Sequence, residues 1–146
     1  MSEEANALAI MLFSELLTAD QLLRNKLGRV LPKGMEISHF SVLNHLASTS
    51  SERTPAQLAK SFHLTRGAMT NTLGKLERAG YIHIRPDWDD ARRKQVAISP
   101  AGRSARDVAL AGIGPVIEKL VTEMGGDKLR LALPFLRDLR LKLEQD

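Results

Sequence analysis

A candidate contact surface in the middle of the chain combines two cations with a hydroxyl and an amide. Its members are Arg66, Thr70, Asn71 and Lys75. At 3.6 residues per turn these positions share one side of a helix, where their groups can hydrogen-bond base edges or phosphates. Gly67 and Gly74 lie on the same side, although each costs about 1 kcal/mol relative to alanine in a helix. The pattern predicts a helix that lies close against another surface.

Two short helices joined by a tight turn are expected to position that surface. Thr54 and Gln57 form a Thr-x-x-Gln capping box, with Pro55 at the first helical position. Thr65 is predicted to cap the second helix, which spans about residues 66–79. Gly80 then suits the left-handed backbone conformation that often follows the end of a helix. The apolar arc of this second helix comprises Met69, Thr72, Leu73, Leu76 and Ala79.

A β-hairpin with a basic loop is predicted next. Residues 81–85 and 94–99 alternate apolar and polar side chains, as half-buried strands do, and the loop between them is polar. The loop ends in Arg92, Arg93 and Lys94; strand alternation would point Arg92 and Lys94 one way and Arg93 the other. A helix-turn-helix followed by such a hairpin is a winged helix-turn-helix.

Positive charge is concentrated in this central segment. Residues 53–106 contain eleven Lys or Arg and four Asp or Glu, a net charge of +7, whereas the whole chain carries +4. The remaining residues therefore carry −3. A basic stretch alone is often only a solvated surface, but here it coincides with the helix and the hairpin. Together they favour a polyanionic partner.

The flanking segments are predicted to be helices with more apolar surface than one core contact needs. Residues from about 5 to 31 and from 129 to 143 carry apolar side chains on more than one side, which suggests a second subunit. Ser38 is expected to cap a helix over about residues 39–47, and Ser99 one running to about residue 124. Gly112, Gly114 and Pro115 predict a bend in the latter, and Asp127 is expected to cap the last helix.

Composition argues against several classes of protein. The chain of 146 residues has no cysteine, which excludes disulfides, thiolate zinc sites and thiol redox sensing. Its four histidines match no metal-site spacing, and no nucleophile–base pattern or phosphate loop is present, so neither an enzyme nor a cofactor is expected. The start of the chain is acidic, and no apolar run is expected to approach the roughly 18 residues of a membrane span. A soluble, cytoplasmic protein with no membrane partner is therefore expected.

The winged segment resembles the MarR family of bacterial transcription regulators. The matching stretches are Leu58-Ala59, Leu64-Thr65, residues 69–73, residues 76–82 (LERAGYI), Asp90-Ala91-Arg92 and residues 96–102 (VAISPAG). One departure is Asn71, where the family often has Arg or Lys. The resemblance implies a single, mainly α-helical domain over residues 1–146 with a small β-hairpin. Its winged helix-turn-helix would span about 36–99, between dimerisation helices at about 5–31 and 100–146.

The resemblance also implies a homodimer that binds double-stranded DNA. The helix that starts at Arg66 would read the major groove, and Arg92 would hold the position of the family's minor-groove arginine. Asp90 would brace Arg92 by a salt bridge, or the pair would simply close the turn. The residues expected to contact DNA are Thr65, Arg66, Thr70, Asn71, Lys75, Asp90, Arg92 and Arg93.

Control by a small ligand, often an aromatic acid or phenol, is a further implication of the resemblance. Phe13, Leu17, Phe40 and Leu43 are the candidate lining residues, and all four would serve equally well in a core. The leading function is a ligand-responsive repressor that acts as a homodimer on a pseudo-palindromic operator. Two alternatives stay open: a winged-helix module that binds an acidic protein, and an architectural DNA-binding protein without a ligand.

Overall fold

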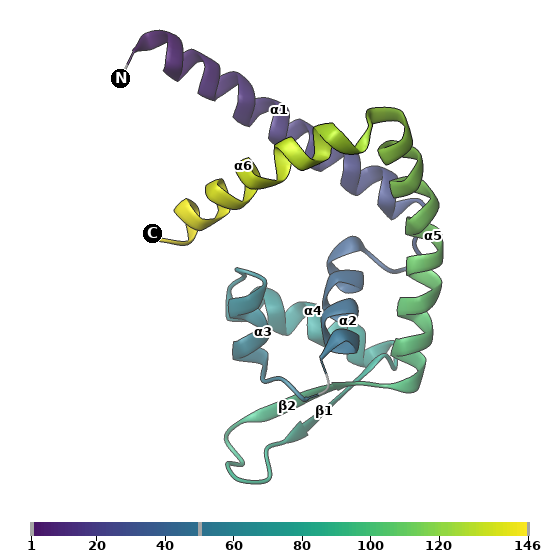
Figure 1. The fold of residues 1–146 in the computed structure, drawn as a ribbon. Coiled ribbons are helices and arrows are strands. Elements are labelled where there is room, and N and C mark those ends of the chain that lie inside the picture. The colour runs from purple at the N-terminus through teal and green to yellow at the C-terminus, as the bar shows by residue number, and fades with distance from the viewer. Residues whose placement is uncertain (1, 50, 146) are drawn as a thin grey trace.

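The computed structural model describes residues 2–49 and 51–145. The fold is mainly helical with one two-stranded antiparallel hairpin (Figure 1), as the sequence predicts. In chain order the elements are α1 (Glu3–Gly28), α2 (Ile37–Ser48), α3 (Pro55–Ser61), α4 (Arg66–Arg78), β1 (Ile82–Pro86), β2 (Lys94–Ile98), α5 (Pro100–Met124) and α6 (Gly126–Glu144).

The hydrophobic core lies within the winged body, defined here as residues 31–113. Every element of this body contributes to it, because each places its apolar positions on the same side. On α4 the buried side chains are Met69, Leu73 and Leu76, which are three of the residues on the predicted apolar arc. Other core members include Leu31, Met35, Val42, Leu43, Leu46, Leu58, Ala59, Ile82, Val96, Ala109 and Ile113.

The helix ends of the helix-turn-helix follow the sequence signals closely. Thr54 and Gln57 exchange hydrogen bonds of 2.9 and 3.1 Å between side chain and backbone, which forms the predicted capping box of α3. The Thr65 hydroxyl oxygen accepts the backbone N–H of Ala68 at 3.1 Å and caps α4. Gly80 ends α4 with φ of +80°, as predicted. The end of α3 has the same left-handed backbone, with φ of +54° at His63, a conformation that usually favours glycine.

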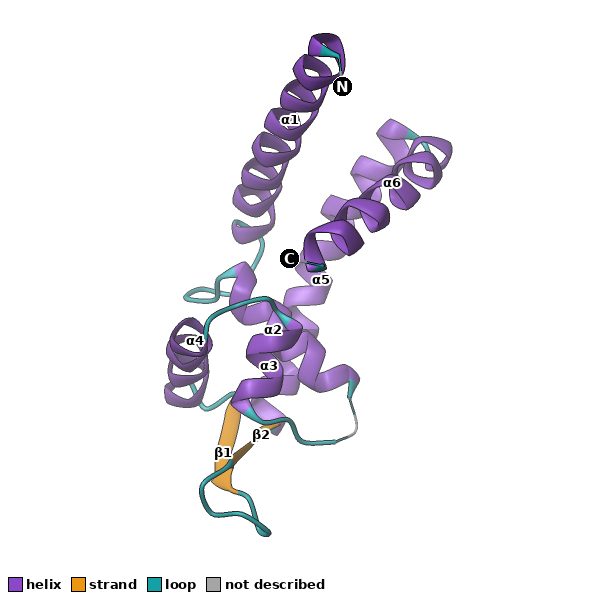
Figure 2. Cartoon of the chain, turned by 90° about the vertical axis from the view of Figure 1, so that its left-hand side faces the viewer, coloured by secondary structure: helices purple, strands orange, loops and turns teal. Residues whose placement is uncertain are grey.

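The hairpin, here called the wing, is fastened to the body at its base. Ile82 pairs with Ile98 and Ile84 with Val96, which places the apolar residues of both strands on one face. Arg53 adds two backbone hydrogen bonds to Val96 from the loop before α3. Figure 2 shows the wing projecting from the end of the body opposite α1.

Two expectations about helix caps were wrong. The cap of α2 is Glu36, whose backbone N–H donates to His39 Nδ1 at 3.1 Å, so α2 starts before the predicted Ser38 cap. Gly125 precedes α6, and Asp127 lies inside its first turn. Helix α5 is continuous through Pro115, so the glycines and the proline do not end it. Gly112 serves packing, because a Cβ there would collide with the Val30 carbonyl oxygen.

The outer helices α1 and α6 differ from the body because none of their described residues is buried. Large apolar side chains are exposed on both, for example Leu17 at 70% and Leu131 at 80%. Figure 1 shows that α1 extends away from the body, whereas α6 turns back from the end of α5 towards the body. By length and composition alone α1 also qualifies as a candidate membrane span, so the expectation that no segment approaches one was too strong. Such a single helix is weak evidence for a membrane.

Candidate nucleic-acid interface

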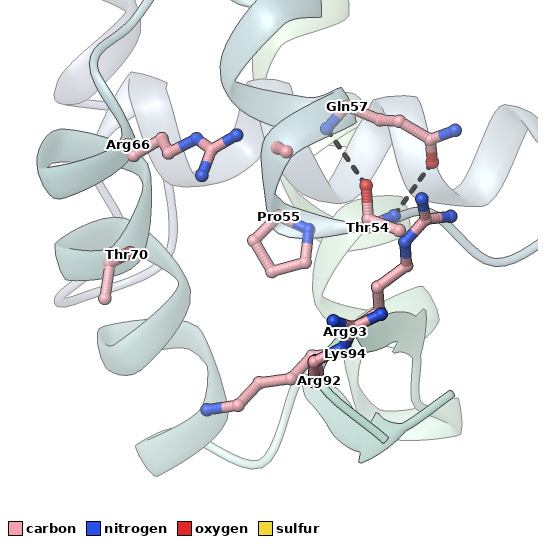
Figure 3. Close-up of a pocket in the computed structure, with 9 residues that line it drawn as sticks. Thr54, Pro55, Gln57, Arg66, Thr70, Arg92, Arg93 and Lys94 are labelled. Carbon is pink, nitrogen blue, oxygen red and sulfur yellow. Dashed lines mark hydrogen bonds between the residues drawn. The ribbon is translucent and has the colours of Figure 1, made fainter. Parts of the chain in front are cut away.

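A groove of about 700 Å³ lies between the start of α3, the N-terminal half of α4 and the wing. Figure 3 shows the side chains that surround it. None of these nine residues is acidic, and four of them are cations. They are Thr54, Pro55, Ala56, Gln57, Arg66, Thr70, Arg92, Arg93 and Lys94.

Helix α4 contributes one wall of the groove through its first turns. Arg66 and Thr70 line it and are exposed, because the Thr65 cap starts the helix with these positions facing away from the core. Added Cβ atoms meet nothing within 4 Å at Gly67 and only the Arg78 guanidinium, at 3.5 Å, at Gly74. No close backbone packing within the described chain therefore requires these two glycines. They keep the outer face of α4 thin, as the sequence pattern predicts.

The wing contributes the opposite wall through a braced pair of arginines. The Asp90 carboxylate accepts hydrogen bonds from Arg92 Nε at 3.1 Å and from the Arg92 backbone N–H at 3.0 Å. Arg93 Nε lies 3.9 Å from the same carboxylate. The hydrogen bond from the Arg92 side chain is the main reason that the pKa of Asp90 is lowered. Asp90 therefore both closes the turn and braces Arg92, whose side chain stays 91% exposed.

Strand alternation, on which the predicted opposition of Arg92 and Arg93 depends, does not hold at these two residues. Strand β2 begins only at Lys94, so the two arginines lie in the loop, where strand alternation does not apply. All three cations line the groove. Together they form one basic wall.

A second aspartate orders the first half of the wing loop. The Asp87 carboxylate accepts hydrogen bonds from Gln95 Nε2 at 2.6 Å and from the Asp89 backbone N–H at 2.8 Å. These hydrogen bonds lower the pKa of Asp87, and the bond from Gln95 contributes most. The Asp87 backbone N–H also donates to the Arg93 carbonyl oxygen at 3.0 Å. The loop is thus closed on itself while its cations remain exposed.

Not every basic residue of the central segment points to the groove. Arg85 pairs with Glu52 at 2.8 Å, and its guanidinium carbon lies 4.7 Å from the ring centroid of Trp88. Lys75 lies beside a separate hollow of about 200 Å³, which His39 and Tyr81 also line. Burial lowers the pKa of His39. The charge of Glu36 opposes this shift, and the nearby charge of Lys75 adds to it. Its Nδ1 accepts a hydrogen bond, which requires the neutral ring.

The predicted site residues are therefore only partly brought together. Arg66, Thr70, Arg92 and Arg93 share the groove, and Asp90 supports its wing wall. Thr65 uses its hydroxyl oxygen as a cap. Asn71 is exposed on α4, and Lys75 lies nearer the other end of that helix.

The candidate ligand residues do not converge on one of the larger hollows of the described chain. Leu43 is fully buried in the core and Phe40 packs against that core. Phe13 and Leu17 lie on α1, where they are 41% and 70% exposed. Among residues 2–49 and 51–145, no group of three or more His, Asp or Glu side chains is placed to hold a metal ion.

Sequence reasoning missed the contribution of α3 and Lys94 to the groove. Thr54 and Gln57 were identified as a capping box, but which element faces the start of α3 depends on the tertiary fold. Lys94 adjoins Arg92 and Arg93 in the sequence, so the run of three cations was a signal for including it.

Comparisons with known proteins agree with this architecture. A sequence model described as MarR family matches residues 33–93. No curated protein sequence matches the chain. The fold resembles the S. aureus MepR–DNA complex (19% identity, 90% of this chain and 97% of that chain, TM-score 0.82). It also resembles the regulator BldR from Sulfolobus solfataricus (21%, 100% of both chains, 0.74).

A third similar structure is PcaV from Streptomyces coelicolor in complex with its natural ligand. Its identity is 18%, the coverage is 88% of this chain and 89% of that chain, and the TM-score is 0.74. At these identities the structural likeness establishes the fold. The resemblance to the MarR family of transcription regulators is therefore confirmed by sequence over residues 33–93. The similar structures share the fold over nearly the whole chain.

Proposed function

We propose that this protein is a sequence-specific regulator of transcription that binds duplex DNA. The observation that carries the proposal is the groove without acidic lining, bounded by the exposed start of α4 and by the cations of the wing. Arginine and lysine on two walls suit a partner with phosphates along two edges. The α4 face, thinned by Gly67 and Gly74, would enter the major groove, and the wing would follow the neighbouring minor groove.

The predicted contact residues on α4 and the wing then differ in their roles. Arg66 and Thr70 lie where they meet base edges and phosphates at the entry of α4. Asn71, on the exposed face of the same helix, carries an amide that can pair with adenine N6 and N7. Lys75 lies farther along α4 and meets phosphate. Arg92, braced by Asp90, enters the minor groove, where negative potential favours a guanidinium.

The active form is a homodimer assembled through α1 and α6. Neither helix has a described residue that the single chain buries, and both expose rows of large apolar side chains. Exposed apolar rows of this kind mark interaction surfaces and suit a second copy of the same helices. Covering them in this way also explains the apolar composition of α1 without a membrane, in keeping with a cytoplasmic protein.

The dimer acts as a repressor on a pseudo-palindromic operator and responds to a small aromatic ligand. The MarR resemblance and the ligand complex of PcaV support this part of the proposal. Phe13 and Leu17 lie on the apolar face of α1, so they would line a ligand site only together with neighbouring helices. No described residue specifies the ligand further.

Selection of bound duplexes from a random pool tests the function. We expect enrichment of a pseudo-palindrome whose half-sites are centred about 34–36 Å apart, with affinity that falls steeply as salt is raised. Recovery of no preferred sequence would leave an architectural DNA-binding protein. Absence of any salt-dependent duplex binding would instead favour a module for an acidic protein partner.

A further inference from the structure

Trp88 stands out among the exposed residues of the winged body. Apart from Leu64, it is the only large apolar residue exposed in residues 2–49 and 51–145 that lies outside α1, α5 and α6. Its side chain is 84% exposed, although tryptophan is on average highly buried. It is also the single tryptophan of the chain. The wing lies at the end of the body opposite α1 (Figure 2), so assembly through the outer helices does not account for this exposure.

The indole ring is supported from one side. The Arg85 guanidinium carbon lies 4.7 Å from the ring centroid, within the range of a cation–π contact. Arg85 is itself fixed, because it pairs with Glu52 at 2.8 Å and donates to the Pro86 carbonyl oxygen at 2.9 Å. With this contact in place, most of the ring surface still faces solvent.

The backbone on both sides of Trp88 is also ordered. Asp87 accepts hydrogen bonds from the Asp89 N–H and from Gln95, and it donates to the Arg93 carbonyl oxygen. A ring held by its loop and by Arg85 loses less conformational freedom on binding than a flexible one. The fold therefore presents a preorganised aromatic surface.

We propose that Trp88 is a further DNA-contacting residue, whose ring packs against deoxyribose in the wall of the groove that the wing enters. This inference rests on the proposed DNA binding. When a hairpin loop enters a groove, each side of the loop faces one wall. Trp88 lies on the first side, and Arg92, Arg93 and Lys94 lie on the second. Arg92 and Arg93 at the end of the loop, with Lys94 directly after it, favour a polyanion over a protein as the occupant. Two of the three carboxylates of the loop are already engaged, because Asp87 accepts a hydrogen bond from Gln95 and Asp90 accepts one from Arg92.

The chemistry of this contact predicts its sequence dependence. Deoxyribose offers the same apolar C–H surface at every nucleotide, so packing on it adds affinity without reading bases. Arg92 in the minor groove gains from the potential of A·T-rich tracts. Loss of the Trp88 ring should therefore weaken all duplexes equally, whereas loss of Arg92 should weaken A·T-flanked duplexes most.

Intrinsic fluorescence gives a direct test with the unmodified protein. The duplex enriched by selection is titrated into the protein while the emission of Trp88 and the anisotropy of a labelled duplex are followed together. We expect the emission to change with the same midpoint as DNA binding. Unchanged emission while the duplex is bound would overturn the contact and leave the proposed function standing. No duplex binding at all would overturn both.

Two substitutions then separate the ring from the fold. Trp88→Ala should weaken binding about tenfold on both A·T- and G·C-flanked operators, the loss expected for an interface aromatic, and Trp88→Phe should retain most of the affinity. Thermal unfolding should stay unchanged, because the side chain is exposed. Wild-type affinity in Trp88→Ala, or a defect confined to binding an acidic protein, would refute the proposal. If Trp88→Ala misfolds, the affinity of Trp88→Phe and the fluorescence of the wild type still decide whether the ring contacts DNA.

Discussion

The winged body and the outer helices use apolar residues in opposite ways. In the body, Leu43, Leu58 and Val96 are fully buried, and their burial fixes where the exposed polar groups of α4 and the wing lie. In α1 and α6 no described residue is buried, and many of the large apolar side chains are exposed. The body thus has a core of its own, whereas the outer helices depend on another surface.

This contrast separates recognition from assembly. The groove is built by local devices within the body, among them the Thr54 and Thr65 caps and the Asp90 brace. The outer helices contribute no residue to that groove. We therefore expect substitutions in the two regions to affect different measurements.

The largest expected effect is on the core of the body. Leu73 is 2% exposed, so Leu73→Ala should lower the free energy of unfolding by about 2–5 kcal/mol. Denaturant titration at fixed protein concentration measures this loss. A cost below about 1 kcal/mol would mean that α4 is not packed as described.

A charged side chain introduced on the outer helices should weaken dimer formation rather than folding. Leu131 is 80% exposed in the single chain, so Leu131→Glu should leave the secondary structure intact. In the proposed dimer it would bury a carboxylate against apolar side chains and weaken association by at least about 3 kcal/mol. Analytical ultracentrifugation measures this, with Glu144→Gln as a control at the end of the same helix. An unchanged dimer would place Leu131 outside the interface.

Two substitutions on α4 should distinguish base reading from electrostatic attraction to DNA. Asn71→Ala should cost about 1–3 kcal/mol against the preferred operator and relax the preference at one position per half-site. Lys75→Ala should weaken all duplexes to a similar extent and make the salt dependence shallower. Binding to a library of duplexes distinguishes the two. A uniform loss in both variants would remove Asn71 from the base-reading residues.

The smallest expected effect is a pH dependence from His39. Burial lowers the pKa of this ring below 6.5, so the folded state prefers it neutral. Its contribution to stability is therefore complete above the unfolded pKa and is lost as pH falls below about 6.5 towards the folded pKa. His39→Gln can keep the hydrogen bond to the Glu36 N–H without titrating. Thermal unfolding between pH 7 and pH 5 should show a smaller decline for this variant than for the wild type.

Local signals in the sequence were enough to place most elements of the body. Thr54, Thr65 and Ser99 cap the helices that follow them, because a capping hydroxyl needs only the backbone three residues onward. The alternation of β1 and β2 gave the correct faces. Ser38 and Asp127 have equally good capping chemistry, but the chain enters those helices earlier, at Glu36 and Gly125.

The site was less predictable because its walls come from three elements. The sequence indicates that Arg66, Thr70 and Arg92 suit a polyanion, but only the tertiary fold brings α3 and Lys94 to the same groove. Gly112 illustrates the same limit. The sequence around it predicts a bend, but it cannot show that Gly112 also permits the close approach of the Val30 carbonyl, a contact between distant parts of the chain.

Changing the spacing of the two half-sites tests the central claim most directly, because it requires both regions at once. Two winged bodies held by rigid outer helices can read only half-sites that face the same side of the duplex. Inserting about 5 base pairs, half a helical turn, between the selected half-sites should therefore reduce affinity to that of nonspecific DNA. Unchanged affinity for the lengthened operator would contradict the account, because the winged bodies would then bind independently of any dimer.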